Sequence, residues 1–323
     1  PAMKTTGLSV ITVCMNRQHH LQATAFRVAE SVHHQEHLVL DWSSREPLRR
    51  DQLPNDSRIR LERVEGESSW NLCRAYNVAA KLAHGDVLLK LDADCWPEHI
   101  DPALHLKTVS DGCWFGSGSD GRLGQFLMSR AAFEAVGGFN ELLVGYGFDD
   151  KGLKARLQSL GFVIQLLPEA SIGVIPHSIH ERVSRTDIKG LSSSPLQESL
   201  SFAQRRATAM SNRVAAAYSP WTTHSMGTRY VQSQNQTFIA DQTSVPQHEP
   251  PVAGELERLR RQVFWGEFLL IPAAVVRRLP QCLLSSDAKG FYVICQWHKI
   301  YWLSIRQIFH FLVMPLEPGF WRI

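Results

Sequence analysis

Two aspartates, Asp92 and Asp94, stand one residue apart directly after a mostly apolar run that begins at Gly85. The run is bounded by turn-forming residues, which is typical of a buried strand. Open α/β sheets bind ligands at the carboxyl ends of their strands, and hard divalent cations prefer carboxylate oxygens, often together with substrate phosphates. The spacing therefore favours a site for a metal ion and a diphosphate, and the alternative is an ordinary solvated turn.

The chain around these aspartates alternates between strand and helix patterns. Strands are predicted at residues 8–14, 37–40, 59–64 (an edge strand), 85–91, 162–167 and 171–175. Helices are predicted at residues 20–34, 70–83 (capped by Ser69), 129–136 (ended by Gly137 and Gly138), 150–160 and from Pro195 onward. This order predicts an α/β fold with a Rossmann-like sheet flanked by helices.

Length and composition are those of an ordinary globular protein, with 323 residues, 44% hydrophobic and 20% charged. The net charge of +3 is too small to indicate a nucleic-acid partner. The six cysteines form no Cys-x-x-Cys pair, which is typical of a reducing compartment and not of a disulfide framework or a zinc site. No secretion signal is recognisable near residue 1, so we expect a cytoplasmic protein.

The C-terminal residues 254–323 are basic and rich in aromatic residues. They carry nine Lys and Arg against five Asp and Glu. Their best apolar run, residues 263–276, is shorter than the roughly 20 residues that span a membrane. One interpretation is a pair of interfacial helices at the inner face of a membrane, on anionic lipid. The other is a helical appendage packed on the rest of the protein or on a partner.

Four segments, in this order, resemble nucleotide-sugar glycosyltransferases of the GT-A fold. Residues 10–17 are similar to the opening strand and loop of glycosyltransferase family 2, and residues 74–94 are similar to its central helix and metal motif. Residues 137–150 resemble a C-terminal motif shared by β-1,4-galactosyltransferases and bacterial chondroitin-synthase-like domains, and residues 175–178 resemble the late metal-binding histidine of that group. The resemblance spans about residues 8–185 and implies a GT-A (Rossmann-like) mixed sheet flanked by helices.

This resemblance implies a divalent ion, Mn²⁺ or Mg²⁺, that neutralises the nucleotide diphosphate as it leaves. Asp94 and His177 match the metal ligands, and Asp92 matches the position that contacts the ribose or the metal. These residues lie far apart in the sequence, so only the fold brings them together. For His177 the structural alternative is a histidine in a surface loop.

The resemblance also implies contacts to the nucleotide. Asp41, at the end of the second strand, matches the position that contacts the uracil or ribose, and a strand-ending turn is the alternative. Asn16 and Arg17 line the same edge in the family. Arg74 is expected to reach the nucleotide or to orient Asp92, against the alternative of an arginine on the helix surface.

The adjacent acids Asp149 and Asp150 begin the predicted helix 150–160. They complement the positive end of the helix dipole, which is a sufficient structural explanation. The resemblance implies more: Asp150 is the general base that takes the proton from an acceptor hydroxyl, and Asp149 holds the acceptor. Gly145 and Gly147 are then expected to let the backbone approach the sugars.

Two departures from the family motif place the identity of the sugars in doubt. Lys151 and Gly152 follow the acids where galactosyltransferases have further acids, and Phe148 replaces a glycine or small residue. Trp114 and Tyr146 have the chemistry to stack on sugar faces, although core packing explains them equally well.

We expect three parts: a GT-A glycosyltransferase catalytic domain at residues 1–190, a helix plus a polar linker or lightly packed surface segment at residues 191–253, and the basic helical tail at residues 254–323. The resemblance implies a metal-dependent, inverting transferase for polysaccharide biosynthesis. Its donor is a UDP-sugar of the galactose, N-acetylgalactosamine or glucuronic acid type, and its acceptor is a glycan or a lipid-linked saccharide. The alternatives are a retaining transferase of the same fold and a catalytically inactive binding or scaffold protein.

Overall fold

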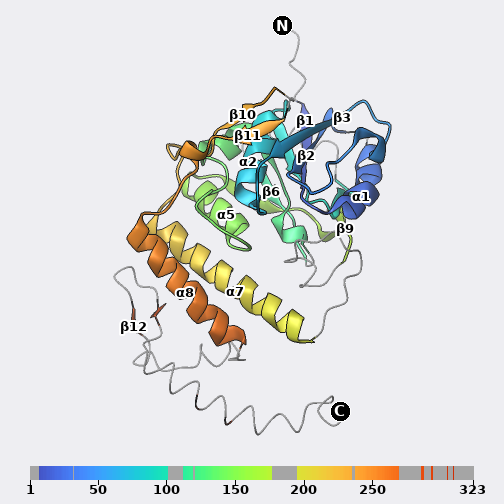
Figure 1. The fold of residues 1–323 in the computed structure, drawn as a ribbon. Coiled ribbons are helices and arrows are strands. Elements are labelled where there is room, and N and C mark those ends of the chain that lie inside the picture. Colours follow the sequence, from blue (N-terminus) through green and yellow to red (C-terminus); the bar gives the residue numbers. More distant parts are fainter. Residues whose placement is uncertain are drawn as a thin grey trace, which may run out of the picture.

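The computed structural model of the chain describes residues 7–31, 33–100, 112–118, 121–176, 195–234 and 237–268, the pairs 285–286 and 292–293, and residues 304 and 308. Within them a nine-stranded mixed sheet has the strand order β10-β11-β3-β2-β1-β4-β7-β6-β8. Figure 1 shows this sheet with its helices and, below it, two long helices side by side. The predicted α/β mixed sheet flanked by helices is confirmed.

The first half of the sheet is parallel. Its strands are β1 (Leu8–Cys14), β2 (Glu36–Trp42), β3 (Ile59–Glu65) and β4 (Val87–Lys90), and its helices are α1 (Gln18–Glu30) and α2 (Leu72–Leu82). Strand β1 pairs in parallel with β2 and β4, so their carboxyl ends share one edge of the sheet. The residues that follow β4, Asp92 and Asp94, therefore lie at the edge where ligands of α/β sheets bind.

The second half contains antiparallel pairs. Its elements are β5 (Cys95–Pro97), β6 (Gly112–Phe115), β7 (Phe126–Ser129), α4 (Arg130–Ala135), α5 (Asp149–Ser159), β8 (Val163–Leu166) and β9 (Ile172–Val174). Strand β7 runs antiparallel to β4 and β6, and β5 pairs with β9 in a separate two-stranded sheet. The pair β5–β9 lies directly after Asp94 and brings a distant part of the chain to it.

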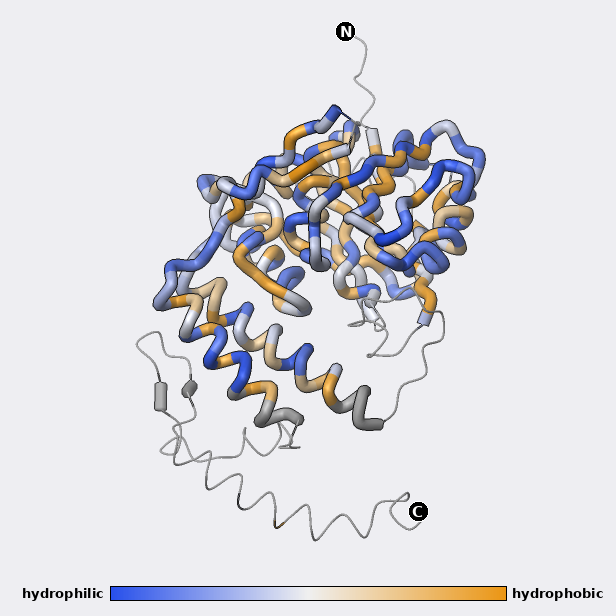
Figure 2. The backbone as a smooth tube through the Cα atoms, in the orientation of Figure 1, coloured by the Kyte–Doolittle hydropathy of each residue, from blue (hydrophilic) through white to orange (hydrophobic). Residues whose placement is uncertain are grey.

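The remaining elements are α7 (Pro195–Tyr218), β10 (Tyr230–Gln232), β11 (Phe238–Ala240), α8 (Pro250–Phe268), β12 (Ser285–Ser286), β13 (Tyr292–Val293) and the 3₁₀ turns η1 (Arg50–Gln52), η2 (Arg122–Gly124), η3 (Glu169–Ser171) and η4 (Gln242–Ser244). Helices α7 and α8 pack against each other, and Figure 2 shows hydrophobic and hydrophilic stretches alternating along both. No helix of the described ranges is long and apolar enough to cross a bilayer. The prediction that residues 254–323 contact a membrane therefore stays untested, because most of them lie outside the described residues.

Three details differ from the sequence prediction. Strand β3 is not an edge strand, because β11 pairs with it and β10 continues the sheet beyond β11. The segment expected as a linker or lightly packed surface thus contributes two strands. Helix α2 is capped by Asn71, whose side chain accepts a hydrogen bond from the N–H of Arg74 at 2.9 Å, and not by Ser69.

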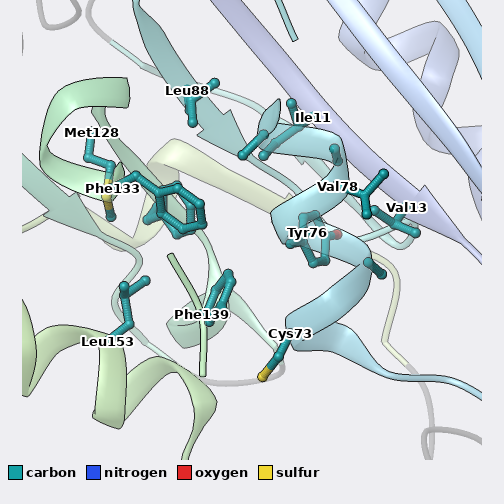
Figure 3. Packing of buried hydrophobic residues seen from close by; sticks show 14 of the residues in the cluster. Ile11, Val13, Cys73, Tyr76, Val78, Leu88, Met128, Phe133, Phe139 and Leu153 are labelled. Atoms are coloured by element: carbon teal, nitrogen blue, oxygen red, sulfur yellow. The ribbon is translucent and has the colours of Figure 1, made fainter. Parts of the chain in front are cut away.

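An aromatic group forms the centre of the largest hydrophobic cluster (Figure 3). The ring of Phe133 lies 5.7 Å from those of Phe126 and Phe139, and the ring of Tyr76 lies 6.4 Å from that of Phe139. Each such pair adds about 0.5–1.5 kcal/mol beyond the burial of its area. Because Tyr76 belongs to α2, this cluster fixes the helix that leads to the Asp92 turn.

Helix α2 also binds, through one side chain, the glycine motif, residues 137–141. Asn77 accepts a hydrogen bond from the N–H of Phe139 at 2.7 Å and donates to the carbonyl of Phe139 at 3.0 Å and to Glu141 at 2.8 Å. Gly138 has φ +67°, and a Cβ there would lie 2.5 Å from Asn77 Oδ1. Three hydrogen bonds prevent Asn77 from moving aside, so only glycine fits at this position.

We expect Gly138→Ala to lower the free energy of unfolding by about 3 kcal/mol or more, because it combines a left-handed backbone with a close contact. Gly161→Ala is the matched control, since Gly161 has φ +88° and nothing within 4 Å; it should cost only about 1–2 kcal/mol. Urea unfolding of both variants measures the difference. Equal losses would show that the contact with Asn77 carries no energy.

Candidate active site

The carboxylate of Asp92 is held by three side chains from three elements. Lys90 Nζ donates to Asp92 Oδ1 at 2.7 Å and Tyr76 OH donates to the same oxygen at 2.9 Å. Gln125 Nε2 donates to Oδ2 at 2.7 Å, while Gln125 Oε1 accepts from the N–H of Asp92 at 2.9 Å. The first acid of the pair is thus oriented by the protein itself.

Lys90 is the unexpected member of this group, because its side chain is 1% exposed. Its ammonium also donates to the carbonyl of Gly124 at 3.0 Å and lies 4.3 Å from the centroid of the Tyr76 ring. Burial raises the pKa of Asp92, but the charge and hydrogen bond of Lys90 with those of Gln125 and Tyr76 outweigh it, so the pKa is lowered. The sequence analysis missed Lys90; the one signal was a lysine inside an otherwise apolar strand.

Asp94 lies two residues further along the same turn and is half-buried. The N–H of Ile175 donates to the carbonyl of Asp94 at 2.8 Å, directly after β9 has paired with β5. The segment expected to carry the late metal histidine thus reaches Asp94 at Ile175. His177 itself lies outside the described residues, so its role stays a prediction.

Asp149 and Asp150 begin α5 after Phe148, which has a left-handed φ of 74°. Burial and, next, the charge of Asp150 raise the pKa of Asp149 to about 6, although the charge of Lys90 opposes the shift. Lys90 and Asp92 are among the charges that act on Asp149, so these three side chains lie within electrostatic reach of one another. The roles predicted for the two acid pairs stay predictions.

The two flanking glycines, Gly145 and Gly147, pack closely on α7. A Cβ on Gly145 would lie 2.9 Å from Thr208 Cγ2, and a Cβ on Gly147 would lie 2.9 Å from the Cβ of Ala209. Both glycines have positive φ and let the loop pack closely on α7. This packing is a sufficient reason for glycine at both positions, and their predicted approach to sugars stays a prediction.

Asp41 organises the loop after β2. Its side chain is 1% exposed and accepts hydrogen bonds from the N–H groups of Ser44 and Leu48, both at 3.0 Å, and from Arg63. Asn16 joins the same loop, since its N–H donates to Ser44 Oγ at 3.0 Å and its Oδ1 accepts from the N–H of Arg45 at 2.9 Å. These three hydrogen bonds are a sufficient structural role for Asp41, and its predicted contact with the nucleotide stays a prediction.

Arg17 and Arg74 also lie near this edge. Arg17 is the N-cap of α1, directly after Asn16. Arg74 pairs with the buried carboxylate of Glu67, whose other oxygen accepts a hydrogen bond from Tyr230 OH at 2.5 Å. One of the two roles expected for Arg74 was to orient Asp92, but Tyr76 and Lys90 do this instead. The other expected role of Arg74, contact with the nucleotide, stays a prediction.

The turn supplies some, but not all, of the oxygen ligands that a hard divalent ion needs. Asp94 and the remaining lone pairs of Asp92 offer carboxylate oxygens at the sheet edge, which suits Mg²⁺ or Mn²⁺. Among the described residues no group of three His, Cys, Asp or Glu side chains is placed to hold a metal. Such an ion would therefore depend on oxygens of the substrate or on residues outside the described ranges, His177 being the predicted one.

A cavity of about 250 Å³ lies away from these acids. It is lined by residues of β1 and β4, by the end of α1 and the residues that follow it up to His34, and by Trp96 of β5. No residue of the predicted site lines it. We therefore assign the candidate site to the Asp92 turn and the start of α5, on chemistry and not on cavity size.

Comparison with known families supports this assignment. Residues 116–181 match the model of the family described as the N-terminal domain of galactosyltransferase. The matched range contains Gln125, the glycine motif and the Asp149–Asp150 pair. The predicted resemblance to glycosyltransferases is thereby confirmed over this part of the chain.

Solved structures with a similar chain path include the mannosyltransferase PcManGT from Pyrobaculum calidifontis in complex with GDP-Man and Mn²⁺, with TM-score 0.48, 15% identity and coverage of 95% of this chain and 87% of that one. The catalytic domain of Drosophila β1,4-galactosyltransferase 7 in complex with xylobiose gives TM-score 0.42, 12% identity and coverage of 73% and 93%. Glucosyl-3-phosphoglycerate synthase from Mycobacterium tuberculosis in complex with Mn²⁺, UDP and phosphoglyceric acid gives TM-score 0.44 and 15% identity, with coverage of 73% of this chain and 87% of that one. A comparison with proteins of curated function found no match.

Removal of the Lys90 charge should destabilise the fold. We expect Lys90→Met to cost about 2–4 kcal/mol, because it leaves the Asp92 carboxylate without its counter-charge. Lys81→Met, on the exposed side of α2, should cost less than about 0.5 kcal/mol. Urea unfolding measures both, and the double variant Lys90→Met/Asp92→Asn should regain most of the loss. A loss that the double variant does not regain would show that the ion pair is not its source.

The raised pKa of Asp149 makes its ionisation unfavourable to folding. The unfolded chain releases this proton at the ordinary pKa of an aspartate, 3.8, whereas the folded chain releases it at a pKa of about 6, so stability falls as the pH rises between these values. Asp149→Asn should therefore be more stable than wild type by about 1–3 kcal/mol at pH 7.5 and equal to it near pH 3.5. Denaturant unfolding at both pH values tests this. An Asp149→Asn variant less stable than wild type at pH 7.5 would contradict the claim that burial and the charge of Asp150 make the ionised Asp149 unfavourable.

Proposed function

We propose that the chain is a metal-dependent, inverting glycosyltransferase that moves a sugar from a UDP-sugar to a hydroxyl of a glycan or lipid-linked saccharide. Galactose, N-acetylgalactosamine and glucuronic acid are the donor sugars to test first. The observation that carries the proposal is the carboxylate of Asp92, oriented by Lys90, Tyr76 and Gln125 at the carboxyl end of β4, with Asp149 within electrostatic reach of it. The family match over residues 116–181 supports the same assignment.

In the proposed reaction the chain's residues hold the donor and move one proton. Asp94 would bind the divalent ion, which when present neutralises the negative charge of the leaving diphosphate. Lys90, Tyr76 and Gln125 keep Asp92 in one orientation, so the first acid of the turn needs no reorganisation when the donor binds. Asn16, Arg17, Asp41 and Arg74 are the proposed nucleotide contacts.

The acceptor half of the reaction is assigned to α5. The acceptor oxygen forms a bond to the anomeric carbon while the bond from that carbon to the diphosphate oxygen breaks. The proton of the acceptor hydroxyl passes to Asp150; since Asp150 Oδ1 already accepts from the N–H of Lys151 at 2.8 Å, we assign the proton to Oδ2. Asp149 would hold the acceptor by a hydrogen bond.

In this proposal the chain consists of a catalytic domain, a segment that completes its sheet, and a C-terminal tail. Residues 1–190 form the catalytic domain, and strands β10 and β11 of the next segment complete its sheet. Residues 254–323 form a basic tail that begins within α8, which packs on α7, and we assign to it contact with a membrane surface or a partner. Localisation at the inner face of a membrane is part of the same proposal.

The test measures UDP release from a panel of UDP-sugars with Mn²⁺ or Mg²⁺. We expect Asp94→Asn to abolish metal-dependent UDP binding, and Asp150→Asn to keep UDP binding but lower transfer by about 100-fold or more, as for loss of a general base. Asp51→Asn, an exposed carboxylate on η1, should change neither.

Each arm has its own contradicting result. Unchanged UDP binding in Asp94→Asn would refute the metal site. Transfer by Asp150→Asn within a few-fold of wild type would refute the general base. A product that keeps the anomeric configuration of the donor would support the retaining alternative and reject direct displacement.

A further inference from the structure

Two exposed aromatic rings and one arginine form a cluster beside the catalytic pair. The rings are Tyr146, 41% exposed, and Phe202, 39% exposed. The guanidinium carbon of Arg205 lies 5.7 Å from the centroid of each ring. Large aromatic side chains exposed together are a common mark of a binding surface.

Within the described part of the protein, Arg205 forms no ion pair with an acidic side chain. There its guanidinium lies in cation–π geometry with these two rings. The arginines of α8 differ, because Arg258, Arg260 and Arg261 form ion pairs with Glu255 and Glu257. Arg205 therefore presents a planar set of donors that suits a carboxylate or a phosphate.

The loop that carries Tyr146 is fixed against α7. Thr208 Oγ1 donates to the carbonyl of Tyr146 at 2.8 Å. Asn212 Nδ2 donates to the carbonyls of Val144 at 2.9 Å and Gly147 at 2.8 Å, and Asn212 Oδ1 accepts from the N–H of Val144 at 3.0 Å. The backbone that carries the Tyr146 ring is thus held on α7 before any ligand binds, which lowers the entropic cost of binding.

The cluster lies close to the proposed chemistry. Tyr146 precedes Asp149 by three residues, and three residues span at most about 11 Å even when fully extended. A short oligosaccharide with its reacting hydroxyl at Asp150 would therefore reach Tyr146 and Arg205 with its next sugars.

We propose that Tyr146, Phe202 and Arg205 form an acceptor subsite for a saccharide that carries an anionic group, a carboxylate or a phosphate. The proposal rests on the proposed transferase function and names the class of its acceptor. The apolar face of a sugar ring packs on Tyr146 or Phe202, and the anionic group accepts hydrogen bonds from the Arg205 fork.

The test titrates the full chain with three matched probes: cellobiose, its uronic acid (cellobiouronic acid) and its 6′-phosphate. Wild type should bind at least one anionic probe fivefold or more tightly than cellobiose, and the stronger of the two identifies carboxylate or phosphate. Arg205→Gln should remove this preference and leave cellobiose binding unchanged. Arg213→Gln, which removes a charge from an exposed position of the same helix, should keep the preference, and unfolding curves confirm that both variants are folded.

Three results would overturn the subsite: binding of no probe, equal binding of neutral and anionic probes by wild type, or an anionic preference that survives in Arg205→Gln. The proposed function fails by a different measurement, metal-dependent UDP binding by wild type. A wild type that binds UDP with metal but shows no anionic preference would reject the subsite alone. A wild type without UDP binding would reject the transferase.

Discussion

The site depends on the ion pair between Lys90 and Asp92 at the end of β4. Two charges in a largely buried place carry a desolvation cost, which is offset only when their other hydrogen-bond positions are filled. Tyr76, Gln125 and the carbonyl of Gly124 fill them. These groups come from α2, the start of β7 and η2, so the requirement to satisfy one buried pair positions three elements around the turn.

Helix α2 transmits this order to the rest of the molecule. Tyr76 packs in the aromatic cluster and binds Asp92, and Asn77 beside it holds the backbone of Phe139 and the carboxylate of Glu141. Glu141 in turn accepts from the N–H and hydroxyl of Thr228, both at 2.7 Å, just before β10. Motifs that lie far apart in the sequence are thereby held in register by adjacent residues of one helix.

Much of the fold was predictable because long apolar runs and glycine ends have few alternatives. Strand β1 agrees at both ends with the prediction, and Gly137 and Gly138 end α4 with positive φ. Strands β10 and β11 were not predictable, since three-residue strands in a polar segment carry no clear pattern; their place follows from pairing with β3. For the site, carboxylates at a strand end were recognisable, whereas the roles of Lys90 and Gln125 depend on neighbours distant in the sequence.

We propose that the turn at Asp94 binds a divalent ion together with a nucleotide diphosphate. Crystals of the full chain grown with UDP and Mn²⁺ test it directly, because the anomalous signal locates manganese independently of the protein atoms. We expect a manganese peak bonded to the Asp94 carboxylate and to the diphosphate, with Asp92 still bound to Lys90. Manganese and UDP bound with no contact to Asp94, or crystals in which neither binds, would contradict it.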